Sequence, residues 1–331
     1  MKKLNLRYLL ILLVFTCMAD SCKKQVVPAV TTSSVSDITG TSAVCGGTVT
    51  SQGSGDINER GICWSTASTP TIADYKSVSD ADSVVFSDKL SDLSIATTYY
   101  VRAYATNKAG TGYGEIRSFT TFLADHDGNI YTTVTIGLQT WIVENLKTTK
   151  FNDGTAIPPA PAVTDWNNMK TPAFCWYNND SQTYKPVYGA LYNWYSVNSG
   201  KLCPAGWHVP SYSEWTALNN YLAEKGFGYG GSGDDTGKSL AAASLWLTSS
   251  EPGSVGNDLS GNNKTGFAGM PGGMFIEGRF YVLGETGGWW SSTVISGSSA
   301  AWSKQLNYSG TNFTDIAYFN HCSLSVRCLK D

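Results

Sequence analysis

The stretch Cys203-Pro-Ala-Gly-Trp-His-Val-Pro-Ser-Tyr-Ser-Glu-Trp-Thr-Ala-Leu-Asn-Asn-Tyr-Leu222 carries the clearest local signal for structure in the chain. Ser211 and Glu214 have the spacing of a capping box, in which each side chain satisfies a backbone N–H of the first helical turn. Three apolar residues follow at spacings of three and four, on one side of a helix: Trp215, Leu218 and Leu222. The stretch therefore predicts an amphipathic helix that begins after Ser211 and packs on a core.

The sequence around this helix is rich in aromatic residues and poor in long periodic patterns. Ten of the eleven tryptophans come after residue 140, and glycines interrupt the chain at short intervals. Shorter helices are predicted over Gly189–Val197 and Lys238–Trp246, with short strands and long loops elsewhere. From residue 125 onward the sequence thus predicts an α+β domain, with buried aromatic rings supplying much of its core.

Residues 35–122 follow a different pattern, the period-two alternation of β-strands. In the clearest strand four residues share one face: Tyr99, Val101, Ala103 and Ala105. The predicted strands are 41–50, 59–65, 83–88, 97–106 and 114–121, with a turn at 107–110. Short, evenly spaced strands separated by polar turns predict an all-β sandwich.

The first 21 residues have the pattern of an export signal. Lys2, Lys3 and Arg7 precede the apolar run Leu9–Phe15, which is too short for a permanent membrane span. Ala19-Asp20-Ser21-Cys22 resembles a bacterial lipobox, which implies lipidation of Cys22, a spacer over 22–34 and an outer-membrane lipoprotein facing the periplasm or the cell surface. The alternative is ordinary signal cleavage that leaves Cys22 as a free thiol.

Composition narrows the partners further. The formal net charge is −3, or −5 without residues 1–21, which hold three basic residues and one acid. No run of like charge occurs, so nucleic acid is excluded as an expected partner, and the membrane is expected only through the lipid anchor. Six cysteines follow Cys22 without a CxxC pair, which argues against a zinc site and allows disulfides in an exported protein.

The β-rich segment 35–122 contains Leu93–Val101, Arg102–Gly110, Tyr113-Gly114 and Ser118–Thr121. These residues carry a resemblance to the fibronectin type III-like domains of exported Bacteroidetes proteins. It implies a tyrosine corner at Tyr99 and most often a spacer role, while Ile95 stands where a proline is usual. Cys45 and Cys63 either pair or are buried as thiols, and the sequence leaves both open.

Residues 125–331 contain a series of short aromatic and glycine-containing segments in this order: Asp125–Tyr131, Ile136–Lys147, Phe151–Gly154, Cys175–Asp180, Tyr188–Trp194, Cys203–Pro210, Glu214-Trp215, Gly266–Gly273, Trp289–Thr293 and Ser325–Asp331. In this order the segments resemble the Fibrobacter succinogenes major paralogous (FISUMP) domain. The resemblance implies a lipoprotein of this family with a fibronectin type III-like domain ahead of it. It implies no particular activity.

A weaker similarity concerns the fold of this second domain. Tyr192–Tyr195 and Trp207–Trp215 are similar to the helix–loop–helix of formylglycine-generating enzymes and C-type-lectin-like domains. The chain has His-Val-Pro-Ser where those proteins have Arg-Leu-Pro-Thr, and it lacks their catalytic cysteine arrangement, so enzyme activity is not implied. What is implied is a compact C-type-lectin-like α+β fold with two helices, irregular sheets and adjacent ends.

Disulfide predictions follow from this resemblance. Cys203 is expected to pair with Cys328, which would close a loop of 125 residues and stabilise the fold by about 4–5 kcal/mol in the chain-entropy model. Cys175 and Cys322 would form the remaining pair, and a Cys322–Cys328 bridge is the competing arrangement.

Few residues suggest catalysis. Neither HExxH nor GxSxG occurs, and the three histidines are His126, His208 and His321. His208 is interpreted as a packed or capping residue rather than as a catalytic base. The capping box accounts for Glu214 without a role as general acid. Gly226-x-Gly228-x-x-Gly231 matches a dinucleotide motif in letters only, because it follows a helix, and it predicts a flexible loop.

Several side chains suggest ligand binding instead. Asp125, Asp127 and Asn129 surround a glycine and offer the oxygens that calcium prefers, although an Asx-type turn explains the same pattern. Calcium is the one cofactor these residues suggest. Asn257, Asp258, Asn262 and Asn263 add loop oxygens for a ligand or ion. Trp289 and Trp290 alternate in direction if they lie on a strand, so one is a candidate stacking platform for a sugar ring.

Together these observations predict a non-enzymatic cell-envelope lipoprotein, in which a sandwich spacer carries a domain that binds carbohydrate or a surface protein. A structural subunit of a surface assembly and an enzyme acting on polysaccharide are the alternatives.

Overall fold

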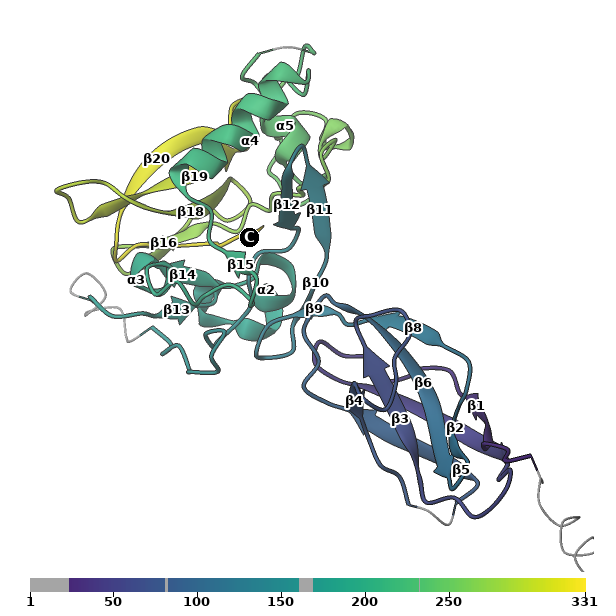
Figure 1. The fold of residues 1–331 in the computed structure, drawn as a ribbon. Helices are drawn as coiled ribbons and strands as arrows, with labels where there is room; N and C mark the ends of the chain where they lie inside the picture. Colours follow the sequence, from purple (N-terminus) through teal and green to yellow (C-terminus); the bar gives the residue numbers. More distant parts are fainter. Residues whose placement is uncertain (1–23, 81–82, 161–168, 232) are drawn as a thin grey trace, which may run out of the picture. The chain divides into compact units, whose positions relative to one another are not determined.

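The computed structural model describes residues 24–80, 83–160, 169–231 and 233–331 (Figure 1). The chain divides into two compact units, Met1–Thr121 and Phe122–Asp331. The export signal and the lipidation site predicted at Cys22 lie outside the described residues. None of the helices in the described part of the chain combines the length and apolar character that a membrane span needs.

The first unit is a β-sandwich of two antiparallel sheets. One sheet has the order β1-β2-β5, and the other has the order β4-β3-β6-β7, with β8 also paired to β6. The strands are β1 Ala29–Thr32, β2 Ala43–Ser51, β3 Glu59–Ser65, β4 Tyr75–Lys76, β5 Val85–Leu90, β6 Thr98–Asn107, β7 Gly110–Tyr113 and β8 Arg117–Thr120. Apolar residues of both sheets form one buried cluster between them, which is the fibronectin type III-like arrangement.

Most of the expected features of this unit are present. Tyr99, Val101, Ala103 and Ala105 are all buried on the core face of β6, as the alternation predicts. The Tyr99 hydroxyl accepts a hydrogen bond from the Ser94 backbone N–H at 3.0 Å, which confirms the tyrosine corner.

Two details of this unit differ from expectation or resolve an open question. The spacer predicted over 22–34 is too long, because Ala29–Thr32 already forms β1 and pairs with β2. Cys45 and Cys63 are buried free thiols rather than a disulfide. Each packs as a small apolar residue, and burial raises the pKa of Cys45 to about 11.

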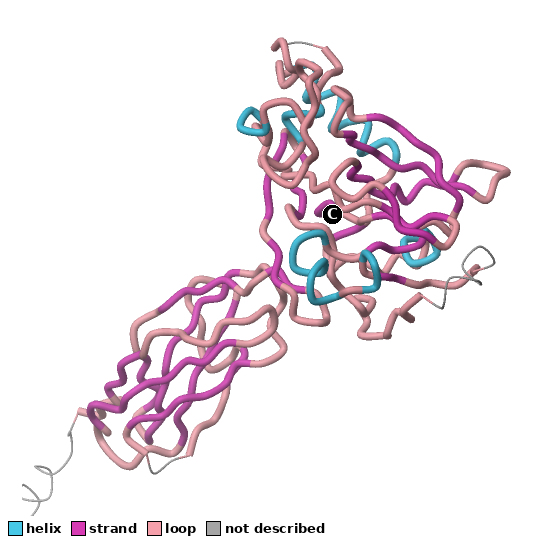
Figure 2. The backbone as a smooth tube through the Cα atoms, turned by 180° about the vertical axis from the view of Figure 1, so that it is seen from behind, coloured by secondary structure: helices cyan, strands magenta, loops and turns pink. Residues whose placement is uncertain are grey.

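Among its described residues the second unit is built from small antiparallel sheets and the helices α2 to α5 (Figures 1 and 2). The sheet orders are β11-β12-β22-β15, β13-β14-β21-β16-β17, β18-β19-β20 and β10-β9. The strands are β9 Leu123–Ala124, β10 Ile130–Tyr131, β11 Thr133–Ile136, β12 Gln139–Ile142, β13 Phe174–Cys175, β14 Leu191–Asn193, β15 Trp207–His208, β16 Met274–Ile276, β17 Arg279–Tyr281, β18 Thr286–Val294, β19 Ala300–Asn307, β20 Thr314–Phe319, β21 Ser323–Leu324 and β22 Leu329–Lys330. The helices are α2 Ser181–Tyr188, α3 Trp194–Val197, α4 Tyr212–Glu224 and α5 Gly237–Leu240, with single 3-10 turns at η2 Tyr177–Asn179 and η3 Leu259–Gly261.

Helix α4 forms where the opening stretch predicts it. Ser211 is the N-cap, and the reciprocal bonds of the capping box with Glu214 are both present. The helix buries its predicted stripe of Trp215, Leu218 and Leu222 in the main core of the unit. In that core the Trp215 ring stacks on Trp141 with 4.6 Å between ring centroids.

The other two predicted helices are shorter than expected. Within Gly189–Val197, residues Leu191–Asn193 form β14 and only α3 is helical, because the Asn193 side chain caps the Ser196 N–H and starts the helix there. Within Lys238–Trp246 only the four-residue α5 forms. Helix α2 was not predicted, and it is capped by Asp180, whose carboxylate accepts from two backbone N–H groups.

The two ends of the second unit lie together, as the resemblance implies. Strand β22 pairs with both β12 and β15. The predicted disulfide between Cys203 and Cys328 is present, with 6.0 Å between the Cα atoms.

The second predicted disulfide is wrong. Cys175 and Cys322 are both buried free thiols, and Cys328 is already paired, so the competing Cys322–Cys328 bridge is absent as well. Cys175 packs instead in a small apolar cluster with Tyr177, Leu191 and Phe275. Its thiol therefore fills core volume in the way that a small hydrophobic side chain does.

Candidate functional site

A buried polar network occupies the centre of the second unit. The Asn145 Oδ1 atom accepts from Trp289 Nε1 at 2.8 Å and from Arg327 Nε at 3.1 Å. Arg327 is fully buried, donates to the Phe267 and Ala268 carbonyls, and has its guanidinium 4.3 Å from the Phe267 ring centroid. Burial lowers the pKa of Arg327 to about 9. Asn145, Phe267, Trp289 and Arg327 belong to segments that carry the family resemblance. Because these side chains are buried, they stabilise the fold and do not form an exposed site.

The prediction that Trp289 or Trp290 offers an exposed platform is wrong. Both side chains are fully buried. Trp290 Nε1 donates to the Tyr192 carbonyl at 2.7 Å, while Trp289 packs in the main core. Both faces of β18 are covered by other parts of the unit, so the alternation along the strand leaves neither ring in solvent.

His208 lies between two carboxylates. Its Nδ1 is 2.6 Å from Asp331 Oδ1, and its Nε2 is 3.0 Å from Glu214 Oε1. Burial lowers the pKa of His208, but the two carboxylates raise it by more, so the pKa lies above its ordinary value of 6.5. Because both ring nitrogens are engaged, His208 joins the chain end to α4 and has no nitrogen left for a substrate proton.

Glu214 is likewise fully engaged. Its Oε2 accepts from the Ser211 backbone N–H and hydroxyl, each at 2.7 Å. Burial raises the pKa of Glu214, and the Ser211 and His208 hydrogen bonds lower it by more, so the carboxylate is held ionised. The capping box therefore explains this residue without a role as general acid.

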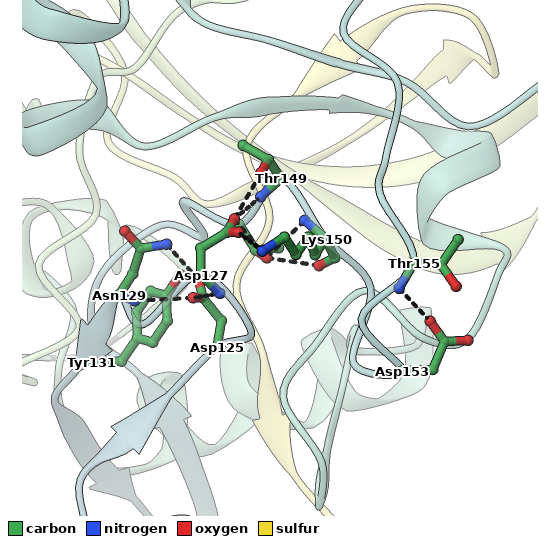
Figure 3. Close-up of polar contacts among 9 residues, drawn as sticks. Asp125, Asp127, Asn129, Tyr131, Thr149, Lys150, Asp153 and Thr155 are labelled. Carbon is green, nitrogen blue, oxygen red and sulfur yellow. Dashed lines mark hydrogen bonds and ion pairs between the residues drawn. The ribbon is translucent and has the colours of Figure 1, made fainter. Parts of the chain in front are cut away.

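Asp125 and Asp127 stabilise the chain where the second unit begins (Figure 3). Asp125 accepts from the Asp127 and Asn129 backbone N–H groups at 2.9 and 3.0 Å, which is the Asx-type turn. Its second oxygen accepts from the Asn129 amide and the Tyr131 hydroxyl. Both Asp125 carboxylate oxygens, which a calcium site would use as ligands, therefore already accept hydrogen bonds from within the turn and from Tyr131.

The Asp127 side chain contacts Thr149 and Lys150 instead of the turn. Its carboxylate accepts from the Thr149 backbone and hydroxyl and lies 3.3 Å from the Lys150 ammonium (Figure 3). Burial raises the pKa of Asp127, and the Thr149 and Lys150 contacts lower it by more. In the part of the chain that the structure describes, no group of three or more His, Cys, Asp or Glu side chains could hold a metal ion. Calcium binding at 125–129 stays a prediction without structural support.

A pocket of about 130 Å³ brings together side chains that the sequence separates by more than 30 residues. Asn257 and Asp258, both predicted ligand residues, line it. The other lining residues are Phe227, Gly228, Tyr229, Lys238, Ser239, Gly261 and Lys264. The Tyr229 side chain is 52% exposed, and Asp258 and Lys264 are exposed as well. The pocket therefore combines an accessible aromatic ring with hydrogen-bond donors and acceptors.

Lys238 forms the buried base of this pocket. It is only 7% exposed, and its ammonium donates to the carbonyl oxygens of Ser254 at 3.4 Å, of Asp258 at 3.0 Å and of Asn257. Burial lowers the pKa of Lys238, the Asp258 carboxylate raises it, and the Lys264 ammonium lowers it. The net pKa lies below the ordinary value of 10.5.

The other two predicted ligand residues act within the loop. Asn262 is buried, and its amide donates to the Ala242 and Val255 carbonyls, each at 3.0 Å. The Asn263 side chain accepts from the Ala268 backbone N–H at 2.8 Å. Neither lines the pocket, so Asn257 and Asp258 are the two of the four that the fold places at it.

The glycine-rich segment Gly226–Gly231 is a loop, as expected, and it also forms part of the pocket, which the sequence did not predict. It carries Phe227 and Tyr229 to one wall of the pocket. Tyr229 packs closely over Gly253, where an added Cβ would lie 2.7 Å from the ring. Lys238 and Lys264 were also missed, because an isolated lysine in sequence gives no sign that a pocket will form beside it.

The fold therefore defines a class of two-unit proteins, in which a β-sandwich unit is followed by an α+β unit with joined ends, a long-range disulfide and a polar pocket. The chain belongs to the Fibrobacter succinogenes major domain family, whose model matches residues 134–330. No curated protein matches the chain.

Solved structures similar to the chain are fibronectin type III-like domains and a sensor domain. The sensor domain of the anti-sigma factor RsgI4 from Pseudobacteroides cellulosolvens is 22% identical, with 30% of this chain and 97% of that chain covered and a TM-score of 0.23. The third fibronectin III domain of human KIAA0343 is 16% identical, with 31% and 90% covered and a TM-score of 0.23. At these TM-scores neither likeness carries an argument about function.

Proposed function

We propose that the second unit is a non-enzymatic binding module that holds carbohydrate in the pocket of Tyr229, Asn257, Asp258 and Lys264. The observation that supports this proposal is the accessible Tyr229 ring, which lies in the same pocket as a hydrogen-bond donor, Lys264, and an acceptor, Asp258. A sugar presents C–H groups to a ring face, and its hydroxyls both donate and accept. Ligand pockets combine apolar and aromatic contacts with a few well-placed polar groups that fix the orientation of the ligand.

Each pocket residue has a distinct part in this proposal. The Asp258 carboxylate accepts from sugar hydroxyls, and its pKa is lowered chiefly by the Ser260 hydroxyl, so it stays ionised. The Lys264 ammonium donates, since it has no hydrogen-bond or ion-pair partner among the described residues. Tyr229 supplies the stacking face. The C-type-lectin-like fold belongs to the same proposal, since it would present such loops on a fixed frame.

The test is binding of the full-length chain to a broad panel of neutral and acidic polysaccharides. Where a polysaccharide binds, Tyr229→Ala is expected to weaken its binding by about tenfold, because the loss of a central aromatic contact costs more than 1 kcal/mol. Tyr281→Ala is the matched control, since Tyr281 is also exposed in this unit but does not line the pocket. Equal effects of the two substitutions, or no binding across the panel, would contradict the proposal.

We also propose that the chain is an outer-membrane lipoprotein anchored through Cys22, with the sandwich as a spacer. The support is the basic, apolar and small-residue pattern of the first 22 residues. In cells fed a labelled fatty acid, the wild-type protein should incorporate label in the membrane fraction. A Cys22→Ser variant that still carried label would show that the anchor lies elsewhere.

A further inference from the structure

Three backbone carbonyl oxygens of one loop converge on a single positive charge. They belong to Ser254, Asn257 and Asp258, and the charge is the ammonium of Lys238. Among the described residues, no ion pair joins Lys238 to a carboxylate, so neutral carbonyl dipoles supply its hydrogen bonds. Convergent carbonyl oxygens are the surroundings that proteins otherwise build for hard metal cations.

The loop brings three backbone carbonyl dipoles toward one position. Its backbone makes two successive four-residue turns, with the Asn257 N–H donating to the Ser254 carbonyl and the Gly261 N–H donating to the Asp258 carbonyl. Asp258 adopts a left-handed conformation with φ of 48°. The carbonyl oxygens of Ser254, Asn257 and Asp258 point to one ammonium, and without that positive charge their dipoles would repel one another.

The Lys238 side chain reaches this position from a different element. Lys238 belongs to α5, and its stem passes beside Gly261, where an added Cβ would lie 3.5 Å from Lys238 Cε. The Asn263 N–H donates to the Lys238 carbonyl, so the loop is tied to α5 by main chain as well as side chain. The fold of α5 against the loop therefore places the Lys238 ammonium between the carbonyls, and no ion from solution is needed there.

We propose that the Lys238 ammonium is a built-in cation that takes the place of a bound metal ion in the 254–258 loop, shaping the pocket wall without calcium. The Ser254, Asn257 and Asp258 carbonyls suit a small monovalent or divalent cation. In the wild-type protein the Lys238 ammonium occupies that position and excludes cations from solution. This inference concerns loop stability and stands whether or not the pocket binds carbohydrate.

The test uses the full-length chain and three variants: Lys238→Met, Lys238→Ala and Lys264→Met. Lys238→Met is expected to lower the Tm of the second unit by about 5–10 °C, because it removes the hydrogen bonds from the ammonium to the Ser254, Asn257 and Asp258 carbonyls. Lys264→Met is the matched control in the same pocket and should leave the Tm nearly unchanged. Ammonium, potassium or calcium should raise the Tm of Lys238→Ala more than that of Lys264→Met, whereas the bulky tetramethylammonium ion should not.

Two results would overturn the proposal. One is an equal Tm for the Lys238→Met and Lys264→Met variants. The other is a rise in Tm with added cations that is the same in Lys238→Ala and in Lys264→Met. Should the Lys238 variants not fold, reductive methylation of the native wild-type chain decides. Slow modification of Lys238 relative to Lys264 supports the proposal, and equal rates contradict it.

Discussion

At the scale of single residues, one amide organises the core of the second unit. Asn145 accepts from both Trp289 and Arg327, and its amide group donates to the Tyr188 carbonyl at 2.9 Å. The Asn145, Trp289 and Arg327 side chains are buried, so water cannot replace a lost partner among them. The strength of the network therefore depends on every member being present.

Replacing Asn145 by alanine should be among the most destabilising single changes in the chain. It leaves the Trp289 indole N–H and one Arg327 N–H unpaired inside the protein, which costs about 2–4 kcal/mol of unfolding free energy. Urea unfolding of the second unit measures it. Asn198→Ala, at an exposed asparagine, is the control and should change the free energy by less than about 0.5 kcal/mol. A loss at Asn145 no larger than at Asn198 would show that the network is not needed.

His208 should make stability depend on pH. Because its folded pKa is raised above the ordinary 6.5, its contribution is fully present below pH 6.5 and is lost as the pH rises through the folded pKa. The difference in unfolding free energy between wild type and His208→Gln should therefore be largest near pH 6 and shrink toward pH 9. Thermal melts across this range measure it. A difference that is constant with pH would mean that His208 is neutral in the folded protein.

At the scale of elements, helix α4 carries its own start signal. The capping box predicted from Ser211 and Glu214 is present, and the buried stripe is the predicted one. Ser211→Ala should therefore lower the unfolding free energy by about 1 kcal/mol, because it removes the acceptor for the Glu214 N–H. Asn220→Ala, at an exposed mid-helix position, should leave stability the same or slightly higher. Chemical unfolding of both variants decides, and equal losses would refute the capping role.

Other elements were harder to predict because their signals are not local. In Gly189–Val197 the apolar and aromatic residues suit a helix, yet Tyr192 is paired with Phe174 on one side and Leu324 on the other. Phe174 and Leu324 are 18 and 132 residues away from Tyr192 in the sequence, so the residues next to Tyr192 do not reveal this pairing. The pairing partners, not the propensity, decide that β14 is a strand.

At the scale of the whole molecule, one disulfide joins distant parts of the second unit. Cys203 and Cys328 are 125 residues apart, so their bridge should stabilise the unit by about 4–5 kcal/mol in the chain-entropy model. Reduction should lower the melting transition of the second unit. The transition of the first unit should not move, because Cys45 and Cys63 are already thiols. Calorimetry with and without reductant tests this, and a shift of both transitions or of neither would contradict it.

The sequence by itself determined the features whose signals are short: the alternating strands of the first unit, the capped start of α4, and the change of character near residue 125. Family resemblance added the Cys203–Cys328 pairing and the joined ends. Only the tertiary structure decided that Trp289 and Trp290 are core, that Cys175 and Cys322 stay unpaired, and that Lys238 meets the carbonyls of the 254–258 loop. The physical reason is that burial, pairing and cation placement depend on groups brought together from far along the chain, whereas capping and alternation are satisfied within a few residues.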